Sequence, residues 1–291
     1  MGEIQEALRR AALVRKAAQV VGTAVPAEPE APRERDFPAP PPPAAAPLER
    51  QPARVVSLSH AKTGAWKARG LVVEDAGPTP EMFRHLAIRV RRELEARNTR
   101  TIAVVSAQRA EGKTTMSCNL ALALASLGDR RAIALVDLDL RNPSVAPGLD
   151  LSWDAGIDDV LLGQADLTAA RVSLEEPPLD VFPCRRRHQH AHRMLTLASF
   201  ATTLRALERR YEVVVLDTAP ILLVPDAAII LQTVSAAVAV VRAGMSRQRA
   251  VEALCKHVPP NRLIGTILNE GQQPIPKRSY GYYGAPHDAE G

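Results

Sequence analysis

The chain has 291 residues, 46% of them hydrophobic, so it can bury a substantial core in one large domain or two small ones. Its three cysteines, Cys118, Cys184 and Cys255, share no CxxC spacing, which argues against a disulfide framework and a zinc site and fits a reducing cytoplasm. The net charge of +5 suits an anionic partner but selects none. Every apolar stretch is far shorter than the roughly 20 residues that span a bilayer, so we expect a cytoplasmic protein.

Two segments precede the part of the chain in which we expect a folded domain. Residues 1–22 carry apolar side chains at helical spacing among several arginines, which predicts a short amphipathic helix, either solvated or docked on a partner or membrane surface. Residues 23–78 include "VPAEPEAPRERDFPAPPPPAAAP", whose prolines remove backbone donors and fix φ. We therefore predict a mostly disordered, proline-rich linker there.

From residue 79 the pattern predicts an α/β domain that ends near residue 272. "TPEMFRHLAIRVRRELEARN" indicates a helix with Thr79 as its N-cap. Apolar strands are then predicted at 101–106, 132–137, 179–182, 211–217, 236–244 and 263–269. Helices are predicted between them at 113–127, 194–210, 225–232 and 246–257. Continuously apolar strands are buried on both faces, so we expect a mostly parallel central sheet with helices on both faces, followed by a flexible tail over 273–291.

A phosphate-binding loop follows the first of these strands. "AQRAEGKT" fits the phosphate-loop pattern, in which backbone N–H groups face the β-phosphate. Lys113 would then reach the β and γ oxygens, and the Thr114 hydroxyl would bind Mg²⁺. The predicted contacts with ATP are Gln108, Arg109, Ala110, Glu111, Gly112, Lys113, Thr114 and Thr115.

Two acidic motifs lie at the ends of later strands. "ALVDLDLR" places Asp137, Asp139 and Arg141 at alternate positions, on one side of an extended segment, and "VVVLDTAP" ends its strand at Asp217. Strand-ending aspartates often only cap loops. Three carboxylates at two strand ends beside a phosphate loop instead favour a metal-dependent site, because ligands of open α/β sheets bind at this edge.

Together, the phosphate loop, "DLDLR" and "VVVLDTAP" resemble the bacterial tyrosine kinase family, the autokinases that regulate capsule and exopolysaccharide synthesis. The resemblance extends through "GIDDVLLGQADL", "LVPDA" and "GTILN" and covers roughly residues 79–270. It implies a P-loop NTPase fold of the MinD/ParA-like type and a kinase domain over 79–272. In that family a tyrosine-rich C-terminal tail is the substrate, and here three of the four tyrosines lie in the tail: Tyr280, Tyr282 and Tyr283.

The resemblance also implies roles for the site residues. Lys113 and Mg²⁺ would hold the phosphates, and Asp137 would orient the incoming tyrosine hydroxyl and accept its proton. Arg141 would hold the neighbouring carboxylates or the γ-phosphate. The implied metal ligands, direct or through water, are Thr114, Asp139 and Asp217.

Members of the family form ring-like oligomers in which one subunit phosphorylates the next. Their interface helix carries a Glu, an Arg and a second Arg at three-residue spacing, which correspond here to Glu81, Arg84 and Ala87. Arg91 lies one turn beyond Ala87 on the same face, so it either replaces the missing arginine in part or is a solvated helix residue. A homo-oligomer is therefore expected, with an incomplete interface motif.

The resemblance suggests a membrane partner. Many relatives carry membrane helices on the same chain, so this chain is expected to be the soluble half of a split system. A separate membrane polysaccharide co-polymerase would activate it and hold it at the inner membrane. No nucleic acid is expected, because the aromatic interleaving of single-strand binders is missing.

Three departures from the family pattern bear on function. Ala110 replaces a customary glycine in the phosphate loop, which costs backbone freedom. "CRRRHQHAHR" carries His188, His190 and His192 without an evident carboxylate or thiolate partner, which favours a solvated basic loop over a metal site. Gln108 stands where partition ATPases carry a signature lysine. A partition-like ATPase and a non-catalytic nucleotide-binding regulator of a polysaccharide synthase remain as alternatives.

Overall fold

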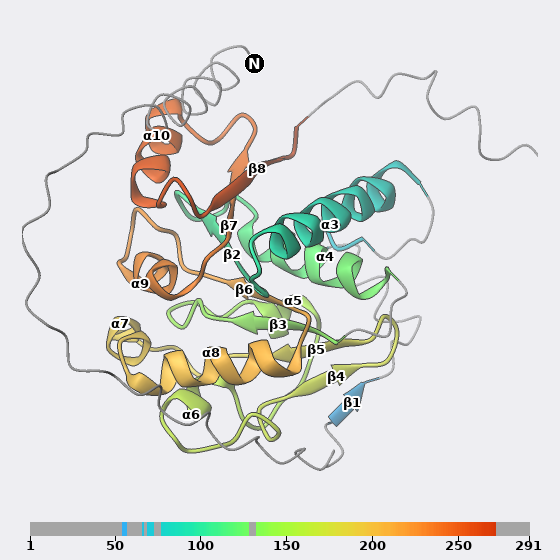
Figure 1. Cartoon of the computed structure of the whole chain (residues 1–291), viewed down its shortest axis with the longest axis vertical. Coiled ribbons are helices and arrows are strands. Elements are labelled where there is room, and N and C mark those ends of the chain that lie inside the picture. Colours follow the sequence, from blue (N-terminus) through green and yellow to red (C-terminus); the bar gives the residue numbers. More distant parts are fainter. Residues whose placement is uncertain (1–53, 57–65, 67–68, 73–76, 128–131, 272–291) are drawn as a thin grey trace, which may run out of the picture.

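The computed structural model describes residues 54–56, 66, 69–72, 77–127 and 132–271. One eight-stranded sheet crosses the molecule (Figure 1). Its strands are β1 (Arg54–Val56), β2 (Thr101–Ser106), β3 (Ile133–Asp137), β4 (Val172–Leu174), β5 (Leu179–Phe182), β6 (Val213–Asp217), β7 (Ala237–Arg242) and β8 (Leu263–Asn269). Their order across the sheet is β1-β4-β5-β3-β6-β2-β7-β8.

All neighbouring strands run parallel except β4 and β5, which are antiparallel. Every residue of the central strands β2, β3 and β6 is buried, as their uninterrupted apolar sequences require for a sheet covered on both faces. The predicted mostly parallel α/β sheet is therefore confirmed.

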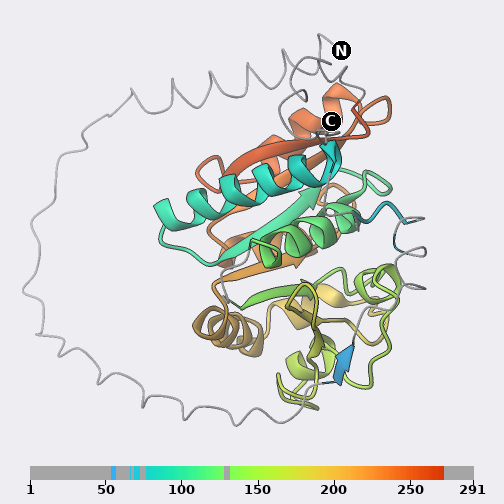
Figure 2. The same ribbon diagram turned by 90° about the vertical axis from the view of Figure 1, so that its right-hand side faces the viewer.

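Helices cover both faces of this sheet (Figures 1 and 2). They are α3 (Pro78–Ala96), α4 (Lys113–Ala125), α5 (Val145–Gly148), α6 (Ile157–Leu161), α7 (Ala191–Leu195), α8 (Ala198–Arg210), α9 (Asp226–Thr233) and α10 (Gln248–His257). Residues of α3 and α4 join one hydrophobic core, and residues of α6 to α10 join a second core on the opposite face. None of the helices in the described ranges is long and apolar enough to cross a membrane.

The folded domain begins before residue 79, where the sequence analysis placed its start. Strand β1 pairs in parallel with β4. Trp66 is 2% exposed, and its indole Nε1 donates a 2.9 Å hydrogen bond to the Leu149 carbonyl. The prediction of a linker up to residue 78 is therefore wrong for these segments. A three-residue strand and a single buried tryptophan are too short to produce a periodic signal.

Two helix boundaries also differ from the sequence prediction. Helix α3 begins at Pro78 with Gly77 as its N-cap, so Thr79 is already helical. The single helix predicted over 194–210 is divided into α7 and α8. The N-terminal helix predicted over 1–22 and the tail predicted over 273–291 lie outside the described residues.

Candidate active site

The phosphate loop joins β2 to α4 and contains two residues with left-handed backbone. Ala110 has φ of 61° and Gly112 has φ of 88°. A Cβ atom on Gly112 would lie 2.0 Å from Nδ2 of Asn269, at the end of β8. Glycine is therefore required at position 112 by both its backbone conformation and the closeness of its neighbour.

Side chains that hydrogen-bond to the backbone of the phosphate loop fix its shape. The Glu111 carboxylate is buried, and its Oε2 accepts a 2.7 Å hydrogen bond from the backbone N–H of Gln108. Its Oε1 accepts a hydrogen bond from the Ser246 hydroxyl. Asn269 donates to the Glu111 carbonyl at 3.1 Å, and Arg242 donates to the carbonyl of the preceding residue at 2.8 Å. The Glu111 side chain, Arg242 of β7 and Asn269 of β8 thus hold the backbone of the loop in place.

Asp217, at the end of β6, is the centre of the site. Its Oδ1 lies 3.0 Å from the Lys113 ammonium and accepts a 2.9 Å hydrogen bond from the Ser117 hydroxyl. Its Oδ2 accepts a 2.6 Å hydrogen bond from the Thr114 hydroxyl. Asp139 Oδ2 lies 3.7 Å from the same ammonium nitrogen, Lys113 Nζ. The structure therefore brings together the loop lysine, the loop threonine and two of the predicted carboxylates.

Asp137, at the end of β3, is fully buried beside this group. Its Oδ1 accepts a hydrogen bond from the backbone N–H of Asp139 at 3.2 Å. Its Oδ2 accepts from the N–H groups of Ser144 and Val145, both at 3.0 Å. Burial and the neighbouring Asp217 raise the pKa of Asp137 to about 8. The Asp137 carboxylate therefore anchors the start of α5 as well as facing the site.

The charges and donor atoms of this group fit a divalent cation. Burial lowers the pKa of Lys113, but the Asp217 and Asp139 carboxylates outweigh it and the pKa is raised. Burial also raises the pKa of Asp139. Full ionisation of Asp137, Asp139 and Asp217 would put three negative charges beside one ammonium, and the raised pKa values of Asp137 and Asp139 show that a further positive charge is needed to stabilise it. Hydroxyl and carboxylate oxygens are the ligands that Mg²⁺ prefers, so the residues present fit it.

Comparisons with known proteins point to one family. An AAA domain family model matches residues 99–258. The tyrosine-protein kinase CpsD of Streptococcus agalactiae is 31% identical over 216 residues, which cover 73% of this chain and 91% of CpsD. The chain belongs to the bacterial tyrosine-protein kinase family.

One solved structure and one longer protein are also similar to this kinase. The crystal structure of the VpsO kinase domain superposes with a TM-score of 0.58 at 27% identity, over 66% of this chain and 95% of that domain. The succinoglycan biosynthesis transport protein ExoP of Rhizobium meliloti is 26% identical over 234 residues, which cover 73% of this chain but 29% of ExoP. The domain of this chain thus corresponds to nearly the whole VpsO domain and to a minor part of ExoP.

Arg141 of the kinase forms an ion pair that differs from the predicted one. Its Nε donates to Asp226 Oδ2 at 2.6 Å and its Nη2 to Asp226 Oδ1 at 3.2 Å, so the pair is bidentate. The same guanidinium donates to the Gln189 carbonyl and lies 3.4 Å from His192 Nδ1. Arg141 therefore pairs with Asp226 rather than with Asp137, Asp139 or Asp217, whereas its expected contact with the γ-phosphate stays a prediction. Arg141 thereby joins the DLDLR segment to the first turn of α9.

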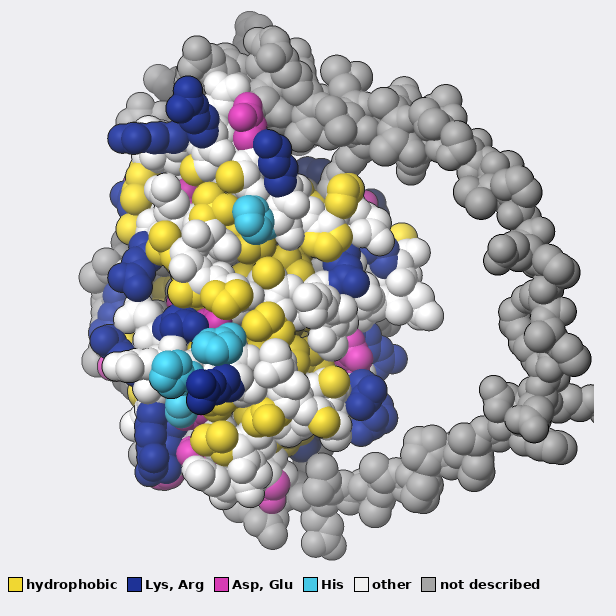
Figure 3. Space-filling view, turned by 90° about the vertical axis from the view of Figure 1, so that its left-hand side faces the viewer, with side chains coloured by type: hydrophobic (Ala, Val, Ile, Leu, Met, Phe, Trp, Pro, Cys, Tyr) yellow, Lys and Arg dark blue, Asp and Glu magenta, His cyan; other side chains and the backbone are white. Residues whose placement is uncertain are grey.

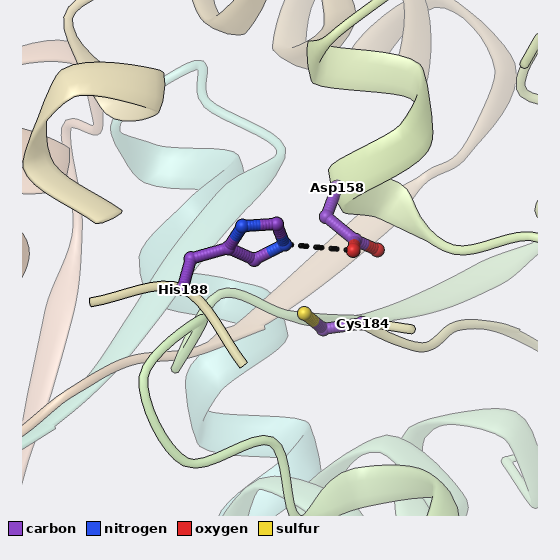
Figure 4. Close-up of side chains that lie close together, drawn as sticks. All are labelled: Asp158, Cys184 and His188. Atoms are coloured by element: carbon purple, nitrogen blue, oxygen red, sulfur yellow. Dashed lines mark hydrogen bonds and ion pairs between the residues drawn. The ribbon is translucent and has the colours of Figure 1, made fainter. Parts of the chain in front are cut away.

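The histidine-containing segment is more ordered than the predicted solvated loop. Figure 3 shows histidine side chains gathered among Lys and Arg side chains on one face of the molecule. His190 is exposed. In contrast, His188 Nε2 lies 2.8 Å from Asp158 Oδ2, and the Cys184 thiol lies beside both (Figure 4). The statement that these histidines lack a carboxylate or thiolate partner is therefore wrong for His188.

The predicted interface residues make contacts within the chain. Glu81 and Arg84 form an ion pair one turn apart on α3. Arg91 lies 3.3 Å from Glu95 and 3.5 Å from Glu212, and the intervening Ala87 is fully buried in the core. Arg91 therefore packs across its own subunit, whereas an interface role for these side chains remains a prediction. Tyr280, Tyr282 and Tyr283 lie outside the described residues.

Sequence reasoning missed several residues that build the site. Ser117 follows Lys113 by one helical turn and therefore faces Asp217, a position that the helix period could have revealed. Asn269 and Asp226 lie within "GTILN" and "LVPDA", which were recognised only as family segments. Their contacts with the phosphate loop and with Arg141 join parts of the chain 158 and 85 residues apart, so local pattern could not predict them.

Proposed function

We propose that this kinase is an ATP-dependent tyrosine autokinase whose domain phosphorylates Tyr280, Tyr282 and Tyr283 of its own tail. The supporting observation is the buried Asp217 carboxylate, which binds both Lys113 and Thr114 of the phosphate loop in a chain of the tyrosine-protein kinase family. Phosphoryl transfer needs positioning and charge neutralisation more than covalent chemistry, and this group supplies both.

The cofactors proposed are ATP and Mg²⁺. The backbone of Gln108–Thr115 would surround the phosphates, and Lys113 would hold their β and γ oxygens. Thr114, Asp139 and Asp217 would hold Mg²⁺, directly or through water. When bound, Mg²⁺ supplies neutralising charge for the phosphate oxygens. The fit rests on the oxygen donors and the excess negative charge around Lys113.

In this proposal Asp137 orients the tyrosine hydroxyl and accepts its proton. Its oxygens accept three backbone N–H groups and the side chain is fully buried, so the Asn142–Val145 segment, which supplies two of these groups, has to move for a hydroxyl to reach the carboxylate. Asp137→Asn keeps the hydrogen-bonding carbonyl but loses the proton acceptor. We expect this variant to bind ATP while its transfer rate falls by about 100-fold or more.

The function is tested by incubating the full chain with ATP and Mg²⁺, with and without a candidate membrane partner, and mapping phosphotyrosine by peptide mass spectrometry. We expect tail phosphate in the wild type and its loss in Lys113→Met. Lys256→Met is the matched control, because Lys256 is exposed on α10. Absence of tail phosphate in every combination would contradict the proposal. ATP-dependent binding to DNA or liposomes would instead favour a partition-like ATPase.

We further propose that transfer occurs between subunits of a homo-oligomer in which Glu81, Arg84 and Arg91 of α3 lie at the interface. The test mixes isotope-labelled Lys113→Met chain with unlabelled wild type. Phosphate on the labelled inactive chain is expected if the active site of one subunit reaches the tail of another. Phosphate confined to the unlabelled chain would show transfer in cis.

The proposed context is regulation of capsule or exopolysaccharide polymerisation and export, at the inner membrane, through a membrane polysaccharide co-polymerase. The similarity to ExoP, whose name records succinoglycan biosynthesis and transport, supports this assignment. Co-expression with a co-polymerase from the same genome should move the kinase into the membrane fraction and raise its tail phosphorylation. A kinase that stays in the soluble fraction at unchanged phosphorylation would contradict it.

A further inference from the structure

Three side chains converge outside the nucleotide site. Asp158 lies in the first turn of α6, and Cys184 and His188 follow β5. Their donor atoms, a carboxylate oxygen, a thiol sulfur and an imidazole nitrogen, all lie within 4.8 Å of one another. Figure 4 shows the imidazole and the carboxylate facing each other above the sulfur of Cys184. Asp158 and Cys184 are each 1% exposed, and the His188 side chain is 20% exposed. The cluster is thus enclosed on the protein side and reachable from the surface through the histidine.

We propose that Asp158, Cys184 and His188 bind a zinc ion. Sulfur, imidazole nitrogen and carboxylate oxygen are the donors that zinc takes in proteins, at about 2.0–2.3 Å. Donor atoms around a tetrahedral zinc therefore stand roughly 3.5 Å apart. This spacing lies between the 2.8 Å of the Asp158–His188 pair and the 4.8 Å limit of the cluster. Three protein ligands leave the fourth position to water.

The Asp158 carboxylate is already oriented by contacts of the kind that surround metal ligands. Its Oδ1 accepts the N–H of Arg185 at 2.7 Å, and its Oδ2 accepts the N–H of Arg186 at 3.1 Å. A Cβ at Gly156 would lie 2.3 Å from Oδ1, so glycine makes room for this placement. The two backbone contacts alone would explain Asp158 as a loop anchor. They do not require a thiol and an imidazole at the same point, and zinc binding accounts for all three.

Zinc at this cluster would act on the active site through the backbone. The N–H of His188 donates a 2.7 Å hydrogen bond to the carbonyl of Leu140, which lies between Asp139 and Arg141. The next carbonyl along, that of Gln189, accepts from the Arg141 guanidinium. Binding of zinc would therefore brace the segment that positions the DLDLR carboxylates. The inference concerns binding and does not depend on the proposed kinase function.

The test uses the full chain without a histidine tag, titrated with Co²⁺ as a spectroscopic substitute for zinc. Excess Mg²⁺ is present to occupy the oxygen ligands around Asp217. A thiolate ligand gives a sulfur-to-cobalt charge-transfer band in the near ultraviolet. We expect this band in the wild type, and zinc should displace the cobalt and remove it.

Two variants and two matched controls identify the ligands. Cys184→Ser retains a donor for the Arg186 carbonyl, so the fold should persist, but the charge-transfer band should vanish. His188→Gln should weaken zinc binding by more than about tenfold in competition with a chromophoric chelator. Cys255→Ser, on α10, and His190→Gln, at the exposed end of the segment, should leave both readouts unchanged. Circular dichroism of each variant shows whether it is folded.

Two spectroscopic results would overturn the proposal. One is a cobalt spectrum without a thiolate band in the folded wild type. The other is an identical band in folded Cys184→Ser. Zinc should also raise the melting temperature of the wild type, since it binds the native state, and should not raise that of Cys184→Ser. An equal rise in both proteins would place the metal elsewhere.

Discussion

Two buried aspartates, Asp217 at the end of β6 and Asp158 in the first turn of α6, have different structural roles. Asp217 accepts hydrogen bonds from the side chains of Lys113, Thr114 and Ser117, three residues within one and a half turns of α4. Asp158 instead accepts backbone N–H groups from a loop 27 and 28 residues away. Polar side chains around Asp217 can turn toward a bound phosphate or metal. Backbone groups around Asp158 cannot leave without unfolding the loop. The first arrangement suits chemistry, and the second suits anchoring.

Asp217→Asn should have the largest effect, because it removes the charge that Lys113, Thr114 and Mg²⁺ share. We expect the rate of tail phosphorylation to fall by about 100-fold or more, while the free energy of unfolding changes little since two carboxylates remain near Lys113. Kinetics with ATP and urea unfolding measure the two quantities. A stable variant with an unchanged rate would remove Asp217 from the centre of the site.

Asp158→Asn should lower the stability more than the phosphorylation rate, which is the reverse of the effects expected for Asp217→Asn. Its amide oxygen can replace only part of a carboxylate that accepts two backbone N–H groups and faces His188. We expect the free energy of unfolding to fall by about 2–3 kcal/mol, measured with urea, while the phosphorylation rate at low temperature stays within severalfold of wild type. Asp166→Asn is the control, because Asp166 is exposed and caps a single N–H. Equal stability of both variants would contradict the anchoring role.

Arg141 lies between the two regions, because it ends the DLDLR segment and donates to the Gln189 carbonyl, and the strength of its pair with Asp226 can be measured directly. Arg141→Lys keeps the charge but loses the bidentate geometry, and Asp226→Asn loses the charge. A double-mutant cycle in urea should give a coupling energy of about 1–2 kcal/mol. Additive effects would show that the pair contributes no interaction of its own and that Gln189 and His192 hold Arg141.

Ala110→Gly should give the smallest change, and a favourable one. Ala110 has φ of 61°, a conformation that costs an L-residue roughly 1–2 kcal/mol and glycine very little. Because glycine also loses more entropy on folding, we expect a net stabilisation of about 0.5–1 kcal/mol, seen as a small rise in melting temperature. A lower melting temperature would show that the strain is not present in solution.

The difference between short local motifs and contacts across the fold explains how much could be predicted from the sequence. The boundaries of β2, β5 and β8 were predicted to the residue, since each is a short, mostly apolar run between turn signals. Lys113, Thr114, Asp139 and Asp217 were predicted together because each belongs to a short motif at a strand end. These predictions needed only local pattern and the rule that parallel strands end at one edge.

The rest depended on contacts between distant segments. Trp66 donates a hydrogen bond to Leu149, 83 residues away, and the sequence around residue 66 has no pattern that predicts this contact. The start of the domain was therefore predicted too late. His188 was interpreted as solvated because its partner, Asp158, lies 30 residues earlier, and the intervening chain forms a helix and two strands. The partner of Arg141 was misassigned for the same reason. Side chains that pair across the fold carry no signal in their immediate neighbours.

The most direct test of the central claim follows the phosphate from ATP to the tail. The purified chain is dephosphorylated and then incubated with Mg²⁺ and ATP labelled with heavy oxygen on its γ-phosphate, and the products are analysed by peptide mass spectrometry. The account predicts labelled phosphate on Tyr280, Tyr282 or Tyr283 in the wild type, and labelling slower by about 100-fold or more in Asp217→Asn. Labelled phosphate released only as inorganic phosphate, with an unmodified tail at every time point and with the membrane partner present, would contradict it.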